Sequence, residues 1–254
     1  MDIGRSFTFP FQDKSWFSKL LIAALISLVP ILNFALVGWM VEIAKRVMDH
    51  ELEELPGWDD FGKKFMGGLY YTVAGFIYAL PVILVSCVMF AISFGSTFAA
   101  AQEGNTEEVV AAIMAGNGIV IFCLSCLVIL YGLVLSVLMP ALLVHYAKED
   151  NFGAMFKLGV VYGKVRENAG TFFMAWLVAL VFSFLAGLAL GGAGSILSLI
   201  PCIGWIAALL ISMLAAPYIS AVYSHLFGQY GDKAYSIPAP ISSAGIPDSL
   251  PPAS

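Results

Sequence analysis

The sequence predicts an all-α, polytopic membrane protein, and two observations support that prediction. Hydrophobic residues make up 60% of the 254 residues, whereas Asp, Glu, Lys and Arg make up only 11%. Soluble domains contain about 25% charged residues, so this chain cannot form an ordinary water-facing surface. The charged residues are also absent from four long stretches, at 20–41, 65–102, 109–147 and 168–231. One helical span needs roughly 20 residues, so each stretch is long enough to cross a bilayer.

The composition excludes several other classes of protein. The formal net charge of −5 argues against nucleic-acid binding through a basic face. The apolar stretches lack the alternation of apolar and polar residues that a membrane barrel strand requires. We therefore expect helices throughout residues 1–230, which form a single transmembrane domain, and a disordered cytoplasmic tail rich in Pro and Ser over 231–254. No secretory signal peptide is expected at the N-terminus.

The first apolar stretch admits two topologies, because Pro30 and Asn33 interrupt it. If the chain reverses near Pro30, residues 17–48 form a short hairpin, and all 12 Lys and Arg residues fall on one side of the membrane. Cytoplasmic loops collect such residues, so we favour the hairpin, which gives about six membrane helices and places both termini in the cytoplasm. If the stretch instead spans once, the protein has five.

The remaining membrane helices follow from the other three stretches. Pro81 is expected to kink the first of them, and a Gly-rich turn at 191–194 is expected to separate the last two. The outer loop at 95–116 is expected to contain a short helix capped by Asn105 and ended by Gly116. Glu107 and Glu108 would lie in its first turn. The helices are expected at residues 66–94, 118–147, 170–190 and 203–227.

Residues 55–65 read as a short cytoplasmic helix at the membrane interface, with proline and acidic residues in its first turn. Aromatic side chains would face the bilayer or the bundle, and lysines would approach lipid headgroups. The expected membrane-interface residues are Trp58, Phe61, Lys63, Lys64 and Phe65.

Several short motifs resemble one family of prokaryotic membrane proteins of unknown function. They are Phe11-Gln12-Asp13-Lys14-Ser15-Trp16, Val29-Pro30-Ile31-Leu32-Asn33, Gly38-Trp39 and Leu55-Pro56-Gly57-Trp58-Asp59-Asp60-Phe61. The resemblance is specific over residues 7–70 and is mainly hydropathic from there to about 230. Trp39 departs from the tyrosine expected at its position. The resemblance implies a multi-helix protein of a prokaryotic cytoplasmic membrane, but it implies no activity, ligand or functional residue.

Few residues in the predicted spans have side chains suited to chemistry. His145 and His225 lie near the cytoplasmic ends of two spans, where they could ligate a haem or a metal, or simply bond to backbone or headgroups. Cys123 and Cys126 share a helix face, which is more typical of packing than of a metal or redox site. We expect no metal site and no cofactor.

Two glycines give a further packing signal. The spacing of Gly187 and Gly191 allows close helix packing, either within the chain or between two copies. Glu42 lies within one turn of Lys45 and Arg46, and we expect it to form an interfacial ion pair.

The absence of charged residues from the predicted spans argues against an ion-coupled transporter. Our leading hypothesis is a non-enzymatic organising, assembly or accessory subunit of a membrane complex. The alternative is a permease or channel for a neutral or amphipathic solute. An intramembrane enzyme would depend only on the two histidines and the cysteine pair. The expected partners are membrane lipids, other membrane proteins or a second copy of the chain, and no nucleic acid.

Overall fold

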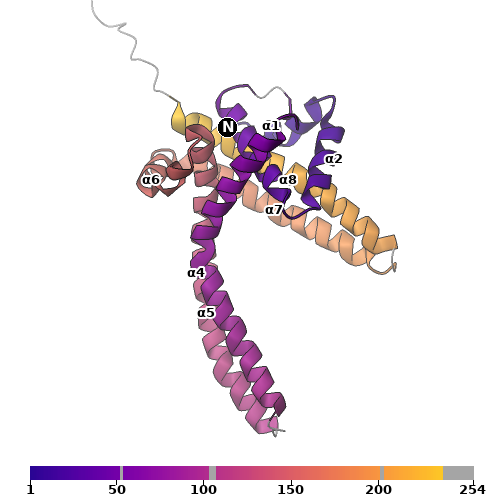
Figure 1. Cartoon of the computed structure of the whole chain (residues 1–254), viewed down its shortest axis with the longest axis vertical. Helices are drawn as coiled ribbons and strands as arrows, with labels where there is room; N and C mark the ends of the chain where they lie inside the picture. Colours follow the sequence, from indigo (N-terminus) through magenta and orange to yellow (C-terminus); the bar gives the residue numbers. More distant parts are fainter. Residues whose placement is uncertain (52–53, 103–106, 201–202, 237–254) are drawn as a thin grey trace, which may run out of the picture.

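Two long helical hairpins diverge from one compact region in the computed structural model (Figure 1). The structure describes residues 1–51, 54–102, 107–200 and 203–236, and these ranges contain helices but no strand. The first arm is the hairpin of α4 (Phe61–Gln102) and α5 (Glu107–Glu149). The second arm is the hairpin of α7 (Ala169–Leu197) and α8 (Ile203–Tyr235).

The compact region, which we call the head, contains the N-terminal helices and the ends of the arms that adjoin them (Figure 1). Its short elements are α1 (Ile3–Thr8), η1 (Phe9–Gln12), α2 (Trp16–Ser27), α3 (Asn33–Met48), η2 (Phe152–Phe156) and α6 (Leu158–Glu167). Within the head, α3 packs against α4, α8 and α5. The segment before α4, and α3 in particular, therefore joins the two arms.

Four helices, α4, α5, α7 and α8, are long and apolar enough to cross a membrane. The protein is thus an all-helical, polytopic membrane protein, as the sequence predicts. The predicted break at Pro30 is also confirmed, because α2 ends at Ser27 and α3 begins at Asn33. With 12 and 16 residues, these two helices fall short of the roughly 20 that a full span needs. Within its described residues, the structure thus contains the predicted set of about six helices, four long ones and the short pair broken at Pro30, and only the four long ones reach the length of a full span.

Two predicted helix boundaries are wrong, and both lie in the arms. The described part of the segment 95–116, the predicted outer loop, contains no separate helix, since α4 continues to Gln102 and α5 runs from Glu107 through Gly116 to Glu149. Asn105 lies outside the described residues. The Gly-rich segment at 191–194 lies inside α7, which ends only at Leu197. Glycine is tolerated in membrane helices, so its helix-breaking tendency in water is a poor guide here.

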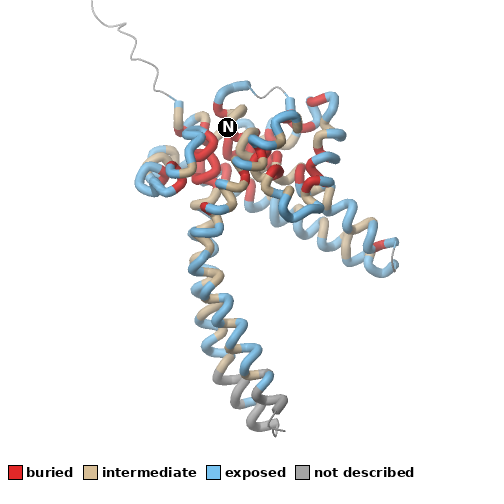
Figure 2. The backbone as a smooth tube through the Cα atoms, in the orientation of Figure 1, coloured by how far each residue is buried: buried red, intermediate tan, exposed pale blue. Residues whose placement is uncertain are grey.

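Burial is concentrated in the head, where red segments gather in Figure 2, while most of both arms is exposed. One buried cluster joins α5, α7 and α8 around Leu142, Leu226 and Phe227. A second joins the N-terminal elements around Trp39 and Ile43. α8 extends to Tyr235, past the predicted domain boundary at 230, and the tail from 237 onward lies outside the described residues.

Candidate functional site

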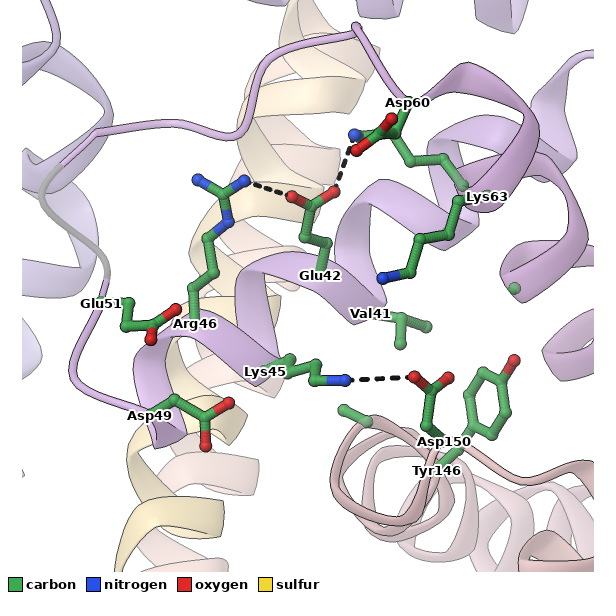
Figure 3. Close-up of a pocket in the computed structure, with 14 residues that line it drawn as sticks. Val41, Glu42, Lys45, Arg46, Asp49, Glu51, Asp60, Lys63, Tyr146 and Asp150 are labelled. Atoms are coloured by element: carbon green, nitrogen blue, oxygen red, sulfur yellow. Dashed lines mark hydrogen bonds and ion pairs between the residues drawn. The ribbon is translucent and has the colours of Figure 1, made fainter.

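A charged pocket of about 290 Å³ lies in the head, where α3, α4 and α5 meet (Figure 3). Its position at the ends of these helices brings together residues that are far apart in the sequence. Four lining residues are basic and five are acidic: Lys45, Arg46, Lys63, Lys64, Glu42, Asp49, Glu51, Asp60 and Asp150. Gly38, Val41, Gly67, Tyr146 and Ala147 complete the lining.

Glu42 is the centre of the strongest ion-pair group in this pocket. It accepts a hydrogen bond from Arg46, one helical turn later, and its other oxygen lies 2.8 Å from Nζ of Lys64 (Figure 3). Lys64 is only 5% exposed, and a buried ammonium group is costly unless it is paired. The predicted ion pair of Glu42 is therefore confirmed for Arg46, and Lys64 from α4 completes it.

Two further pairs close the pocket from the side of α5. Nζ of Lys45 donates to Oδ2 of Asp150 at 3.2 Å. Nζ of Lys148 donates to Oδ1 of Asp49 at 3.3 Å. These contacts tie the C-terminal end of α3 to the C-terminal end of α5, but all four side chains are substantially exposed, so each pair stabilises the fold only weakly.

The pocket owes its shape to a close crossing of α3 and α4 at two glycines. A Cβ atom on Gly38 would overlap the carbonyl oxygen of Lys64, and one on Gly68 would overlap that of Phe34. The two backbones touch at this crossing, as small residues permit in helix packing. Since Glu42 is one turn from Gly38 and Lys64 is one turn from Gly68, the same crossing places the two charged groups side by side.

The predicted interfacial helix over 55–65 is wrong. Residues 54–60 form a non-helical strap across the head, and α4 begins at Phe61. Leu55 is buried, and its carbonyl oxygen accepts from Nζ of Lys19 at 2.6 Å. The indole of Trp39 donates to the carbonyl oxygen of Pro56 at 2.9 Å. Side chains of α2 and α3 thus satisfy backbone groups of the strap, which leaves no need for a separate helix.

The predicted membrane-interface residues have divided roles. Trp58 stacks on Trp39 with ring centroids 5.8 Å apart, and its indole donates to the carbonyl oxygen of Lys19 at 3.1 Å. Phe61 and Phe65 are partly buried on α4 and stack on each other. Lys63 is exposed, but Lys64 is buried in its ion pair. Lys64 is therefore a structural residue of the head and cannot approach lipid headgroups freely.

The two candidate histidines have separate sets of partners. Nδ1 of His225 lies 2.9 Å from Oγ of Ser6, and the ring stacks on Phe9. Nδ1 of His145 lies 2.7 Å from the hydroxyl of Tyr235, while its buried Nε2 has no hydrogen-bond partner among the described residues. The described residues contain no group of three His, Cys, Asp or Glu side chains that could hold a metal ion. The structure thus gives these histidines no shared ligand set.

The other motifs singled out by sequence lie on the arms. Cys123 and Cys126 are free and exposed on α5. A Cβ atom on Gly187 or Gly191 would meet nothing within 4 Å. Packing within the chain, one of the two roles predicted for these glycines, is therefore not seen, and only packing against another molecule stays a prediction.

Comparison with known proteins agrees with this architecture. A family model described as a protein of unknown function, DUF4013, matches residues 21–197. The chain belongs to this family. No curated protein and no solved structure matches it. The matched range begins after the motif at 11–16 and ends before α8, and it includes every residue that lines the charged pocket. The pocket is therefore built within the part of the chain that defines the family.

Sequence reasoning missed the two glycines that shape this site and the tryptophan that binds the strap beside it. Gly38 and Trp39 entered only as part of a resemblance, and Gly68 was not singled out. One signal could have identified the crossing, namely a glycine one helical turn from an acidic residue in one helix and from a basic residue in the next. That spacing holds for Gly38 with Glu42 and for Gly68 with Lys64.

Proposed function

We propose that this protein is a non-enzymatic assembly or accessory subunit, whose two arms pack against another membrane protein. The observation that supports this proposal is the separation of the arms. No residue in the most apolar 18-residue window of α4 or α5 is buried, and only 11% and 17% of the corresponding windows of α7 and α8 are. Polytopic proteins ordinarily pack their spans into one bundle, whereas these spans leave room for a partner between and around them.

One face of the first arm has the features of a contact surface. Phe90, Phe94 and Phe98 recur every four residues along α4, stack in sequence, and are 70%, 62% and 57% exposed. Aromatic residues are enriched at the centres of protein interfaces. This ladder is the part of the arm that we assign to the partner.

Site-specific photocrosslinking in the native membrane tests this assignment. A photoreactive residue at Phe90 is expected to give one crosslinked product of defined mass. Val88 is also exposed, at 52%, but its position is about 200° around the helix axis from that of Phe90. A photoreactive residue at Val88 should therefore give little crosslinked product or none. Equal crosslinking at the two positions, or products with lipid alone, would contradict an oriented partner.

The proposal includes an orientation for the molecule, with the head in the cytoplasm. Its support is that all 12 Lys and Arg residues lie outside the central parts of the arms, because basic residues collect on the cytoplasmic side. Single cysteines at Lys14, Gln102 and Ser243, in a chain whose native cysteines are replaced, would test it. An impermeant thiol reagent applied to intact cells should label only position 102, and labelling at 14 would reverse the assignment.

A permease for a neutral or amphipathic solute is the second candidate function. The feature that favours it is a mainly apolar recess of about 370 Å³ between α5, α7 and α8, lined in part by Ser136, Trp176 and Ser183. Purified protein in sealed vesicles should then move a solute without a partner. The subunit proposal expects no flux from the isolated chain.

A further inference from the structure

Three charged side chains of the pocket lack an ion-pair partner among the described residues. Lys63 is the basic one, and Asp60 and Glu51 are the acidic ones. The amino group of Lys63 is directed into the pocket (Figure 3). The other charged lining residues are already paired. Lys63 and Asp60 lie on the same side of the pocket, whereas Glu51 lies across it (Figure 3), so a ligand would meet one free cation and one free carboxylate together.

The pocket lies where the first arm leaves the head. Lys63 is two residues before the charge-free stretch of α4, and Asp150 directly follows α5. In a membrane this boundary corresponds to the headgroup region, since charged side chains are excluded from the hydrocarbon core. A ligand held here would therefore have its polar part at headgroup depth.

An apolar stripe continues from Lys63 along the same face of α4. Met66, Tyr70, Val73 and Ile77 follow at spacings of three and four residues, which keep them on one side of the helix. Each of these four residues is 40–42% exposed, and Gly67, beside Met66, lines the pocket. The stripe offers an acyl chain a path from the pocket into the bilayer, which a soluble phosphate compound would not need.

We propose that the pocket binds the headgroup of a phospholipid that has both a phosphodiester and a primary ammonium group. Lys63 donates to the phosphate oxygens, and Asp60, on the same side of the pocket as Lys63 (Figure 3), accepts from the ammonium. The five acidic and four basic lining residues disfavour a lipid with net negative charge. The volume of about 290 Å³ compares with roughly 30 Å³ for one water molecule, so the pocket has room for such a headgroup.

Native mass spectrometry of the purified full chain tests this proposal, with phosphatidylethanolamine and phosphatidylglycerol of identical chains as probes. Wild-type protein should retain the ethanolamine lipid preferentially. Lys63→Gln should weaken its retention about tenfold, as loss of a charged hydrogen bond implies, and Lys63→Arg should restore it. The matched control is Lys157→Gln, because Lys157 is exposed, lies outside the pocket and forms no ion pair among the described residues. Asp60→Asn should reduce the preference for ethanolamine, whereas Asp59→Asn should not.

Three results would overturn the proposal. The first is equal lipid retention by wild type and by Lys63→Gln, and the second is equal retention of the two lipids by wild type. The third is displacement of bound lipid by glycerophosphoethanolamine at equal concentration, which would identify a site for a soluble ligand. Thermal unfolding of each variant separates loss of the lipid from loss of the fold. Because the isolated chain is used, the outcome is independent of the proposed protein partner.

Discussion

The head and the arms both contain apolar helical residues, yet these residues are covered in different ways. Within α5, Leu142 in the head is fully buried, whereas Ile129 in the first arm is 62% exposed. The hydropathy of a residue does not show whether protein or lipid covers it, because lipid is as apolar as a leucine side chain. The difference lies in what covers each residue, and it makes the head the part of the molecule where substitutions should change stability most.

The largest expected effect comes from the helix crossing in the head. Gly68→Ala would force a methyl group into the carbonyl oxygen of Phe34 and should destabilise the protein by about 3 kcal/mol, as overpacking does. Gly95→Ala is the matched control, since Gly95 lies on the same helix with open space around it. It should change stability by no more than about 0.5 kcal/mol. Unfolding in detergent measures both, and equal effects would remove the distinction between head and arm.

The next effect should come from the buried charge pair. Glu42→Gln leaves the ammonium group of Lys64, which is 5% exposed, without its carboxylate, and we expect a loss of about 2 kcal/mol. The double variant Glu42→Gln with Lys64→Met should be more stable than Glu42→Gln alone, because no unpaired buried charge remains. If the double variant were less stable, the pair would not be the reason for the loss.

A smaller effect is expected when an aromatic contact in the head is removed. Trp58→Ala loses both the stack on Trp39 and the hydrogen bond to Lys19, for about 1.5 kcal/mol. Amide exchange over residues 54–60 should become faster. Trp205 on the second arm is 64% exposed, and Trp205→Ala should leave exchange in the head unchanged. Protection of the strap that survives Trp58→Ala would show that other contacts hold it.

The same comparison explains what could be predicted from the sequence. The long helices of both arms are predicted by the length of the stretches without charged residues, and the break at Pro30 is predicted by the proline itself. Both are local properties of the sequence. The ends of the arm helices were misplaced at Gly116 and at residues 191–194, because glycine breaks helices less readily in membranes than in water.

The head, in contrast, depends on contacts between distant segments. Residues 55–60 have the local signature of a helix start, but Lys19 and Trp39 bind the backbone of this strap in a non-helical form. Lys64 likewise reads as a surface lysine until the crossing at Gly68 places it beside Glu42. The spacings of Gly38 with Glu42 and of Gly68 with Lys64 could point to the crossing. No local pattern specifies the contacts of the strap, so the rest of the pocket's surroundings could not be derived from the sequence by itself.

The smallest effect concerns Asp13, which joins the start of α2 to the strap. Its carboxylate is buried, accepts from the backbone and hydroxyl of Ser15 at 2.7 Å each, and lies 2.6 Å from Nζ of Lys19. Burial would raise the pKa of Asp13, but the hydrogen bonds from Lys19 and Ser15 outweigh it and hold the pKa below its ordinary value of 3.8. Because the pKa is lowered in the folded state, the ionised carboxylate stabilises the protein at pH values above the ordinary pKa. This stabilisation is lost as the pH falls through the lowered pKa.

Unfolding measured between pH 7 and pH 3 should therefore show a steeper loss of stability in wild type than in Asp13→Asn. Asp59→Asn is the control, because Asp59 is exposed and forms no ion pair among the described residues. It should follow the wild-type curve. Parallel curves for wild type and Asp13→Asn would mean that Lys19 and the strap are held in place without the charge of Asp13. The anchoring of the strap would then depend on the Trp39 and Trp58 contacts and on the hydrogen bond from Lys19 to Leu55.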